Sequence, residues 1–293
     1  MKQFFNRLFK FTLLALVVIA GLFLAGLVSP FVETHLIAKR TDQGAVKLKT
    51  EEFEARYKTP SDTLDFLFLG SSTCYCGINP LTLEVKGYSS FSLCSSAQTL
   101  FNSTQVLDYA TQHCTPKYVV IDVYPELWSG PSSSLEFERD WIINGPSLPL
   151  ERIDPYNAFL KLYFNISKSL GIHHISTKEE EYDRYSGLGF VERSLPAIKT
   201  VSCDSIRTLD FPPQLSSLVD SLKYEIILII PPLCCPDDYV FPESFTVIDG
   251  GQWPGASYKS SYYDDHHLTA SGAYAYSGWL SEELIRLTTD PSE

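Results

Sequence analysis

Short apolar runs alternate with stretches of helical periodicity over most of the chain after residue 62. Three of these runs are rich in β-branched residues, have few polar positions and are bounded by turn residues. Such runs are typical of strands that are buried on both faces of a parallel sheet. The strongest strand candidates are Leu64–Leu69, Tyr118–Tyr124 and Glu225–Ile230, and the weaker ones are Ser90–Leu93 and Phe245–Ile248.

Amphipathic stretches lie between these candidate strands. In Thr99–His113 the apolar residues fall on one face of a helix, and three later stretches are similar. Those three are Pro155–Leu170, Leu209–Leu222 and Ala270–Leu287. Strands that alternate with helices form βαβ units, so the pattern predicts an α/β fold with a central parallel sheet and helices on both of its faces.

The longest apolar run lies near the N-terminus. No charged residue occurs over residues 11–28, and the run extends to Val32. A helix over residues 11–32 would be about 30 Å long, which is enough to cross a bilayer. Three basic residues within residues 1–10 predict a cytoplasmic N-terminus and a body on the other side of the membrane.

A cleaved signal peptide is the alternative interpretation of this run. Signal peptides have a shorter apolar core, of about 7 to 15 residues, and a small-residue cleavage site that is not evident here. We therefore favour an uncleaved, single-pass anchor. Both interpretations predict a body that is periplasmic or extracellular in a bacterium.

The remainder of the chain divides into a linker and one domain. Residues 33–62 are mostly charged and are expected to form a partly helical stalk. Residues 63–293 are long enough for a single α/β domain. Within that domain, residues from about 125 to 205 lack a strong strand pattern, and insertions of this kind often form lids or substrate rims.

Composition excludes one class of function and indicates no cofactor. The chain has 293 residues, with 23 basic and 35 acidic side chains and a net charge of −12. Binding of nucleic acid needs clustered Lys and Arg, and the body has no basic stripe. The seven cysteines are an odd number and show no C-x-x-C spacing, so we expect neither a metal site nor a cofactor. Cys94 could pair with Cys74 or Cys76 in an oxidising compartment.

Two short stretches carry candidate catalytic groups. In "FLFLGSSTCYCGINP" two serines follow Gly70 directly after the first predicted strand, at the end of the sheet where α/β proteins bind ligands. In "YYDDHHLTASGAYAYS" Asp264 and His267 lie three residues apart before the final helix. That spacing allows a carboxylate to orient an imidazole toward a nucleophile. Alternatively, the second stretch is only a capped turn in which His266 and His267 are solvated.

Together the two stretches resemble the SGNH/GDSL hydrolase superfamily. The chain is similar to its membrane-anchored, extracytoplasmic branch, which includes relatives of proteins of teichoic-acid D-alanylation and exopolysaccharide acetylation. The matching segments span roughly residues 62 to 290 and leave the insertion unaccounted for. They are "DFLFLGSSTCYCGINP", "SFSLCSSAQT", "PKYVVIDVYPELW", "IILIIPP" and "YDDHHLTASGAYAYS".

The resemblance implies a three-layer α/β/α, flavodoxin-like fold and a catalytic triad. Ser72 corresponds to the nucleophile, His267 to the base and Asp264 to the acid that orients it. The N–H groups of Ser72 and Cys94 correspond to the donors of the oxyanion hole. In the family the second segment usually reads Asn-x-Gly, whereas Ser92 and Cys94 occupy those positions here.

A further departure concerns the third segment. The Asn that usually supplies a side-chain donor to the oxyanion is missing, and "VIDVYPELW" offers Asp122 and Tyr124 instead. Gln98 is the candidate replacement donor. Loss of one such donor typically costs about 2.7 to 4 kcal/mol of transition-state stabilisation.

The function that the resemblance implies is ester hydrolysis or O-acyl transfer through an acyl-serine. The expected substrate is an acylated, most simply O-acetylated, cell-envelope polysaccharide, and a membrane acyltransferase is a candidate partner. Aromatic residues that could stack on sugar rings are Tyr124, Trp128 and Trp141. One alternative is a catalytically inactive SGNH-fold module that binds glycan or serves as a scaffold in an acylation complex. A cysteine-based redox or metal protein is another.

Overall fold

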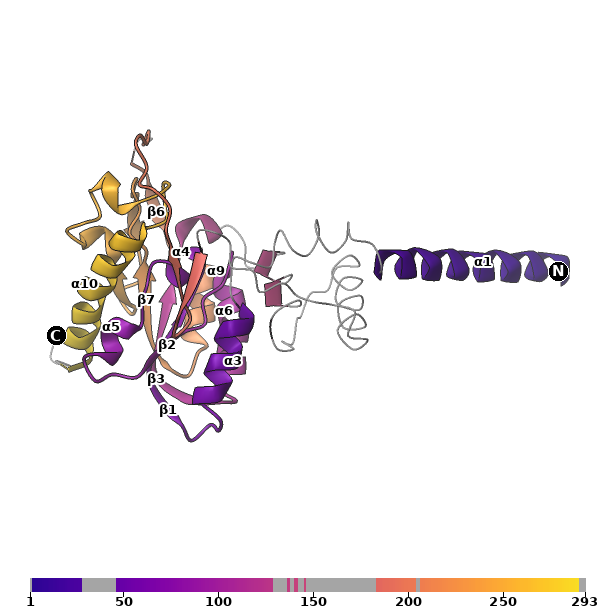
Figure 1. Ribbon diagram of the computed structural model, residues 1–293, viewed down its shortest axis with the longest axis horizontal. Helices are drawn as coiled ribbons and strands as arrows, with labels where there is room; N and C mark the ends of the chain where they lie inside the picture. The colour runs from indigo at the N-terminus through magenta and orange to yellow at the C-terminus, as the bar shows by residue number, and fades with distance from the viewer. Residues whose placement is uncertain are drawn as a thin grey trace.

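The computed structural model describes residues 2–27, 46–128, 136–137, 140–141, 145, 183–203 and 206–289. Within these residues the body is built on a sheet of five parallel strands in the order β2-β1-β3-β7-β9 (Figure 1). The α/β class and all five strand candidates are therefore confirmed. The strands are β1 (Thr63–Leu69), β2 (Ser90–Ser92), β3 (Thr115–Asp122), β7 (Glu225–Ile230) and β9 (Thr246–Asp249).

Helices cover both faces of this sheet. Leu67 and Leu69 of β1 belong to one apolar cluster, whereas Phe66 and Phe68 belong to another, because successive side chains of a strand point to opposite faces. Figure 1 shows the helices on two sides of the sheet. The first cluster is covered by α3 (Val46–Arg56), α6 (Leu100–Ala110) and α9 (Pro213–Asp220), and the second by α5 (Leu81–Glu84) and α10 (Ala270–Thr289).

Two of the expected helices, α6 and α10, are confirmed, and a third is shorter than expected. In the stretch Leu209–Leu222, the residues of β6 (Thr208–Asp210) pair in parallel with β8 (Asp238–Val240), and α9 begins only at Pro213. Two successive prolines explain this boundary, since proline disfavours helix in the preceding residue but is accepted in the first turn. The expected helix over Pro155–Leu170 lies outside the described residues.

The insertion contains a β-hairpin that its sequence did not predict. Strands β4 (Asp183–Gly187) and β5 (Phe190–Arg193) are antiparallel, and the Ser92 N–H donates to the carbonyl of Leu188 in the turn between them. At Gly189 φ is +83°, and a Cβ there would lie 1.7 Å from the Ser92 carbonyl oxygen. Only glycine allows so close an approach, which docks the hairpin on the edge strand β2.

The second half of the expected stalk region contributes a helix to the body. Helix α3 buries Val46, Lys49 and Phe53. The Phe53 ring lies 5.1 Å from that of Phe91 on β2. The region is partly helical, as expected, and this helix packs on the sheet.

A long apolar helix precedes the body. Helix α1 runs over Lys2–Leu27, and its segment Gln3–Gly21 is long and apolar enough to cross a membrane. None of that segment is buried against the rest of the described chain. The helix begins earlier in the sequence than the span expected over residues 11–32. The prediction of a helix long enough to cross a membrane is confirmed.

The order of the strands predicts a crevice at their carboxyl ends. The connection from β1 to β2 runs through α5 on one face of the sheet, and the connection from β2 to β3 runs through α6 on the other. Open parallel sheets bind ligands where successive connections leave for opposite faces. The residues that directly follow β1 therefore lie where a site is expected.

Candidate active site

A constrained turn after β1 presents Ser72. Gly70 has φ of +148°, and a Cβ at this position would lie 2.5 Å from the Cβ of Asp122. Glycine is therefore required here, because any side chain would meet β3. The carbonyl of Gly70 accepts a hydrogen bond of 3.0 Å from the Ser95 N–H, and Ser72 then opens the short helix α4 (Ser72–Tyr75).

A closed turn before α10 carries the acid and the base. Tyr262 and Leu268 form an antiparallel bridge on either side of it, and the Tyr263 N–H donates to the carbonyl of His267 over 3.0 Å. Thr269 then caps α10, since its hydroxyl accepts from the Gly272 N–H. The capping interpretation of this stretch is correct for Thr269, and the turn that precedes the cap holds the histidine in place.

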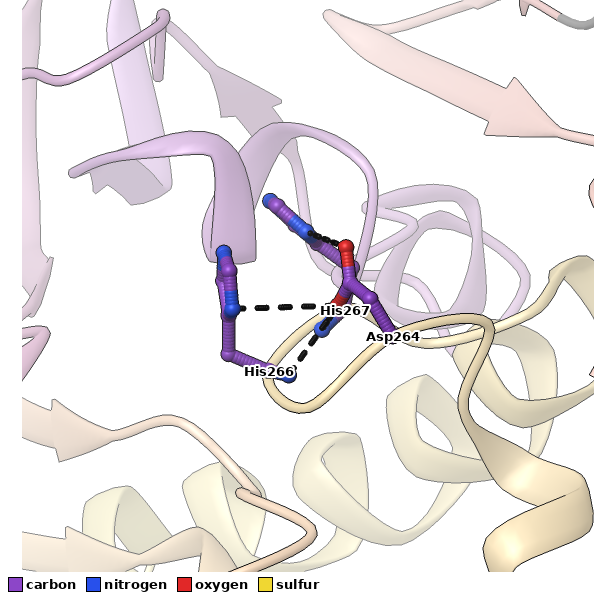
Figure 2. A group of neighbouring side chains, drawn as sticks. All are labelled: Asp264, His266 and His267. Carbon is purple, nitrogen blue, oxygen red and sulfur yellow. Dashed lines mark hydrogen bonds and ion pairs between the residues drawn. The ribbon is translucent and has the colours of Figure 1, made fainter. Parts of the chain in front are cut away.

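The structure brings Ser72, His267 and Asp264 together, as the sequence predicts. The Nε2 atom of His267 lies 2.8 Å from the Oγ of Ser72, although 195 residues separate them. The Nδ1 atom of His267 lies 2.7 Å from the Oδ2 of Asp264 (Figure 2). The other Asp264 oxygen accepts from the backbone N–H groups of His266 and His267. We call these three residues the triad.

The environment gives the triad suitable protonation states. Burial raises the pKa of Asp264, but hydrogen bonds and charges from His267 and His266 outweigh it and lower the pKa to about 2. Burial, only partly opposed by Asp264, lowers the pKa of His267 below its ordinary 6.5. At neutral pH the carboxylate is therefore ionised, Nδ1 donates to it, and Nε2 is free to accept the proton of Ser72.

Arg193, at the end of β5, supports the triad from the hairpin side. Its guanidinium donates to the hydroxyl of Tyr263 over 2.5 Å and to that of Tyr75 over 2.7 Å, and its Nε lies 3.1 Å from a carboxylate oxygen of Asp183. The ring of Tyr263 stacks on His267 with centroids 5.2 Å apart. The docked hairpin thus supports His267 through Arg193 and Tyr263.

A hollow of about 200 Å³ surrounds the Ser72 hydroxyl. We call it the first hollow. Its lining comes from α4, from the segments after β2 and β3, from β5 and from the turn between Tyr262 and Leu268. We call this last segment the triad turn. The lining residues are Ser71, Ser72, Tyr75, Ser96, Ala97, Tyr124, Leu127, Glu136, Arg193 and His267.

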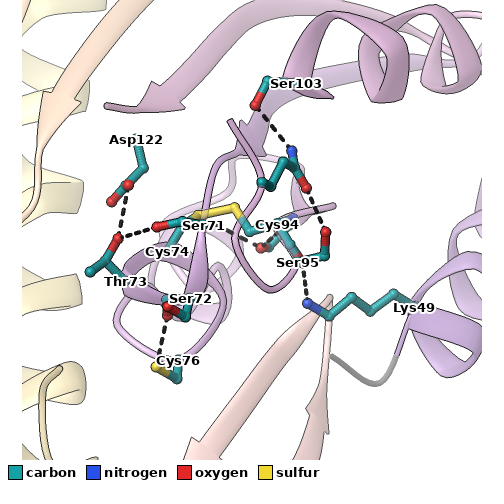
Figure 3. Close-up of a disulfide and its surroundings, with 12 residues drawn as sticks. Lys49, Ser71, Ser72, Thr73, Cys74, Cys76, Cys94, Ser95, Ser103 and Asp122 are labelled. Carbon is teal, nitrogen blue, oxygen red and sulfur yellow. Dashed lines mark hydrogen bonds between the residues drawn. A yellow bond between two sulfur atoms is a disulfide. The ribbon is translucent and has the colours of Figure 1, made fainter. Parts of the chain in front are cut away.

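Neither Cys94, whose N–H was the expected oxyanion donor, nor Gln98 lines this hollow. The Gln98 side-chain N–H donates to Ser103, and its carbonyl accepts from Ser95. The Cys94 N–H faces the Ser92 hydroxyl at 3.5 Å. Both side chains are buried, and the sulfur of Cys94 is bonded to Cys74 (Figure 3).

Two residues that sequence reasoning missed line the hollow in their place. Ser96 and Ala97 belong to the same loop, and Ala97 has a left-handed backbone with φ of +48°. Among the described residues, the N–H groups of Ser72, Ser96 and Ala97 meet no acceptor. The residues of this loop that line the hollow lie two to three positions beyond Cys94, and the oxyanion role of the loop stays a prediction.

Contacts from distant parts of the chain hold this loop, Ser92–Gln98. A disulfide joins Cys94 to Cys74 of α4, with Cα atoms 5.9 Å apart (Figure 3). The buried ammonium of Lys49 donates to the Cys94 carbonyl. The indole N–H of Trp141 donates to the Ser95 hydroxyl over 3.0 Å. The nucleophile and the facing loop are therefore covalently connected.

Cys76, Trp141 and Trp128 were also candidates for a role in the site, but each is packed within the protein. Burial raises the pKa of Cys76 to about 11, so this thiol stays protonated and is a poor nucleophile. Trp141 is buried in the core, and Trp128 packs in an aromatic group with Phe211. Of the three aromatic residues proposed to stack on sugars, only Tyr124 lines the hollow.

The triad turn also contains the one group of potential metal ligands found in the described part of the chain. Asp264, His266 and His267 offer ligand atoms within 4.8 Å of one another (Figure 2). Both ring nitrogens of His267 are engaged, by Asp264 and Ser72, and Nδ1 of His266 lies 2.5 Å from Asp265. A cation would have to displace these hydrogen bonds, whereas the serine chemistry uses them as they stand.

Comparison with known proteins adds no assignment. No known family profile matches the sequence, and no curated protein matches it either.

Proposed function

We propose that this protein is an extracytoplasmic serine esterase or O-acyltransferase of the SGNH type. One observation carries the proposal: the hydrogen-bonded chain from Ser72 through His267 to Asp264, with distances of 2.8 and 2.7 Å. A buried neutral imidazole between an alcohol and an ionised carboxylate is the arrangement that activates serine for attack on an ester.

Acylation would begin with attack of the Ser72 Oγ on the ester carbonyl. His267 takes the hydroxyl proton at Nε2 as the new C–O bond forms, and Asp264 stabilises the resulting imidazolium. The tetrahedral intermediate then collapses. The bond to the alcohol oxygen breaks, His267 returns the proton to that oxygen, and an acyl-serine is left.

Deacylation repeats these steps with a second alcohol or with water. The incoming O–H gives its proton to His267 while its oxygen attacks the acyl carbonyl, and Ser72 leaves with the proton restored. Water as acceptor gives hydrolysis, and a sugar hydroxyl gives acyl transfer. Both outcomes use the same residues.

The negative oxygen of the intermediate needs donors, and backbone groups are the candidates. The N–H groups of Ser72, Ser96 and Ala97 lie in residues that line the hollow and have no acceptor within the described structure. We propose that the loop supplies the second donor, in place of Cys94 and Gln98. Backbone donors fixed in advance stabilise an oxyanion without reorganisation at the moment of reaction.

The fold supports the family assignment. If the sheet strands are numbered along the chain, their spatial order is 2-1-3-4-5, the order of flavodoxin-like folds. The nucleophile follows the first strand, and the acid and base precede the last helix, as the resemblance implies. We propose a three-layer, flavodoxin-like SGNH domain on this basis.

Two features support a location outside the cytoplasm. One is the N-terminal apolar helix after a basic start. The other is a pair of disulfides, Cys74–Cys94 and Cys203–Cys235, which persist in oxidising compartments. We propose a single-pass protein with a cytoplasmic N-terminus and a periplasmic or extracellular body.

The substrate we propose is an O-acylated cell-envelope polysaccharide. A hollow of about 200 Å³ around Ser72 favours a short acyl group such as acetyl. Anchorage by one helix would keep the body near the envelope, where a membrane acyltransferase could act with it.

Labelling with a fluorophosphonate tests the proposal. The probe should modify the full-length protein in detergent, and peptide mapping should find it on Ser72. The Ser72→Ala variant and heat-denatured protein should remain unlabelled. Equal labelling of wild type and Ser72→Ala would contradict the proposal.

An inactive glycan-binding or scaffold module is the second candidate. The observation in its favour is that no Asn or Gln side chain lines the hollow within the described residues. The two candidates differ in turnover of p-nitrophenyl acetate. An esterase hydrolyses it, and His267→Ala abolishes the reaction, whereas a scaffold gives the same background rate with either protein.

A further inference from the structure

A second hollow, of about 360 Å³, adjoins the first. Tyr124 lines both of them. The segment after β3 continues with Glu126 on the side of the second hollow and Leu127 on the side of the first. This volume lies within the usual range of ligand pockets, about 300 to 1,000 Å³.

The triad turn forms the other part of the shared wall. His267 faces the first hollow and its neighbour His266 the second. Their rings lie 3.9 Å apart, and the His266 ring stacks on Tyr124 with centroids 5.2 Å apart. The two hollows are therefore neighbours across one partition, and the catalytic base belongs to that partition.

The chemistry of the leaving group indicates which part of a substrate lies on that side. The imidazole must return its proton to the departing alcohol oxygen, so this oxygen has to lie next to His267. The loop with Ser96 and Ala97 faces the nucleophile from another element and is the candidate site of the carbonyl oxygen. The alcohol half of the ester should therefore extend past His267 toward His266 and the second hollow.

Charge in the second hollow restricts the class of that alcohol. Three carboxylates line it, Glu126, Asp237 and Asp265, against a single guanidinium, Arg207. Arg207 already pairs with Asp237, since its guanidinium nitrogen lies 2.6 Å from the Asp237 Oδ2. The hydrogen bond from Arg207 lowers the pKa of the Asp237 carboxyl. No cationic side chain pairs with Glu126 in the described part of the chain. A phosphate or uronate would be repelled here, whereas uncharged hydroxyl groups can donate to these oxygens.

Another part of the lining of the second hollow is cross-linked. Cys235 lines the hollow and is bonded to Cys203, and the parallel pair β6–β8 places Leu209 beside Tyr239. Both of those residues also line the hollow. A site fixed in this way loses little conformational freedom when a ligand binds.

We infer that the second hollow binds the alcohol half of the substrate and that this half is a neutral sugar, not an anionic one. The inference rests on the proposed function, which leaves the charge of the glycan open. The inference adds that the carboxylates of the second hollow, Glu126, Asp237 and Asp265, allow the enzyme to distinguish neutral glycans from uronate or phosphate polymers.

Binding to a variant that cannot turn over its ligand tests this inference directly. We would use full-length Ser72→Ala protein in discs of zwitterionic lipid and measure calorimetrically the binding of a neutral xylohexaose and of a hexamer of mannuronate. The neutral hexamer should bind at least about tenfold more tightly at low salt. The difference should shrink at 0.15 M salt, where charges are screened beyond about 8 Å.

Two charge reversals supply the matched comparison. Glu126→Lys should reduce the ratio of the affinity for the neutral hexamer to that for the mannuronate hexamer by at least about fivefold. Asp108→Lys makes the same change in charge on the exposed face of α6, which does not line either hollow, and should leave the ratio as it is. Tighter binding of the uronate by the parent protein, or equal shifts in both reversals, would overturn the inference.

Failure of the inference can be told apart from failure of the proposed function. Turnover of p-nitrophenyl acetate by the protein with Ser72 intact reports the serine chemistry without a sugar. If turnover occurs and the uronate binds more tightly, only the neutral-sugar site is refuted. If binding follows the expected order and turnover is absent, the preference for a neutral glycan stands, whereas the esterase proposal and the assignment of the hollow to the alcohol half of an ester fall.

Discussion

Two parts of the lining of the first hollow, the turns that carry the triad and the Ser92–Gln98 loop, are built in different ways. The triad turns are shaped largely by their own residues, with Gly70 at one and the two N–H groups bound by Asp264 at the other, and Arg193 adds support through Tyr263. The Ser92–Gln98 loop depends mainly on distant residues. It is held by a disulfide to Cys74 and a hydrogen bond from Lys49.

This difference separates two kinds of contribution to the proposed reaction. The triad atoms form and break bonds, so each of them should be close to indispensable. The loop would stabilise charge by the placement of its N–H groups, so disturbing it should weaken catalysis by degrees.

Loss of the nucleophile or the base should have the largest effect. We expect Ser72→Ala and His267→Ala each to lower kcat by about 10⁶, and the double variant to lose little more, because the two side chains act as one unit. Steady-state hydrolysis of p-nitrophenyl acetate measures this, and circular dichroism checks the fold. Additive losses would mean that the two residues do not work together.

Asp264→Asn should lower kcat by about 10⁴. An asparagine amide can donate to Nδ1 of His267, which moves the ring proton to Nε2 and removes the acceptor that Ser72 needs. Full-length wild type and variant would be compared with p-nitrophenyl acetate at pH 8. A loss smaller than tenfold would show that the carboxylate is only a capping group of the turn.

Removal of the Cys74–Cys94 disulfide should have an intermediate effect. Displacement of the facing loop by about 1 Å is expected to lower kcat by about 100-fold while KM changes little. Cys74→Ser/Cys94→Ser would be assayed beside the wild type, with thermal unfolding measured on the same samples. Unchanged kcat in a folded double variant would exclude a role of the disulfide in placing the loop.

The acid limb of the pH profile should lie below pH 6.5. Burial lowers the pKa of His267, so the imidazole stays neutral to lower pH than an exposed histidine, and kcat/KM falls only once it is protonated. Below that pKa, each pH unit should reduce kcat/KM about tenfold. A limb centred above pH 7 would contradict a buried neutral base.

Replacement of Lys49 should have the smallest effect, and this effect should be on the stability of the fold. Burial lowers its pKa to about 7, so above pH 7 the unfolded chain binds a proton that the folded protein does not. The free energy of unfolding of the wild type should therefore rise with pH between 7 and 9 relative to Lys49→Met, by at most about 1.4 kcal/mol per pH unit. Lys47→Met, which removes a half-exposed lysine of the same helix, should follow the wild type.

Parallel pH curves for the wild type and Lys49→Met would show that Lys49 keeps its proton when buried. Denaturant unfolding of the three full-length proteins at each pH would give the comparison.

The same contrast explains what the sequence could predict. The apolar strands, the glycine turn and the Asp264–His267 spacing are local patterns with a direct physical meaning. The contributions of Ser96, Ala97 and Lys49 are not, since they depend on how the loop is held from elsewhere. Ala97 has a left-handed backbone, but alanine is not a residue type that indicates this conformation in a sequence, so the sequence offered no signal for it.

The hairpin that carries Arg193 was missed for a related reason. Its strands are short and largely polar on their exposed sides, so they show no apolar run of the kind that marked the central sheet. Two glycines at its turn are the visible signal, and the close approach of Gly189 to Ser92 explains one of them.

The central claim is that Ser72 carries the acyl group during turnover. Full-length protein mixed with p-nitrophenyl acetate and quenched in acid within milliseconds should gain the mass of one acetyl group, and peptide mapping should place it on Ser72. Absence of the adduct during active turnover, or an acetyl group on another residue in its place, would contradict the account.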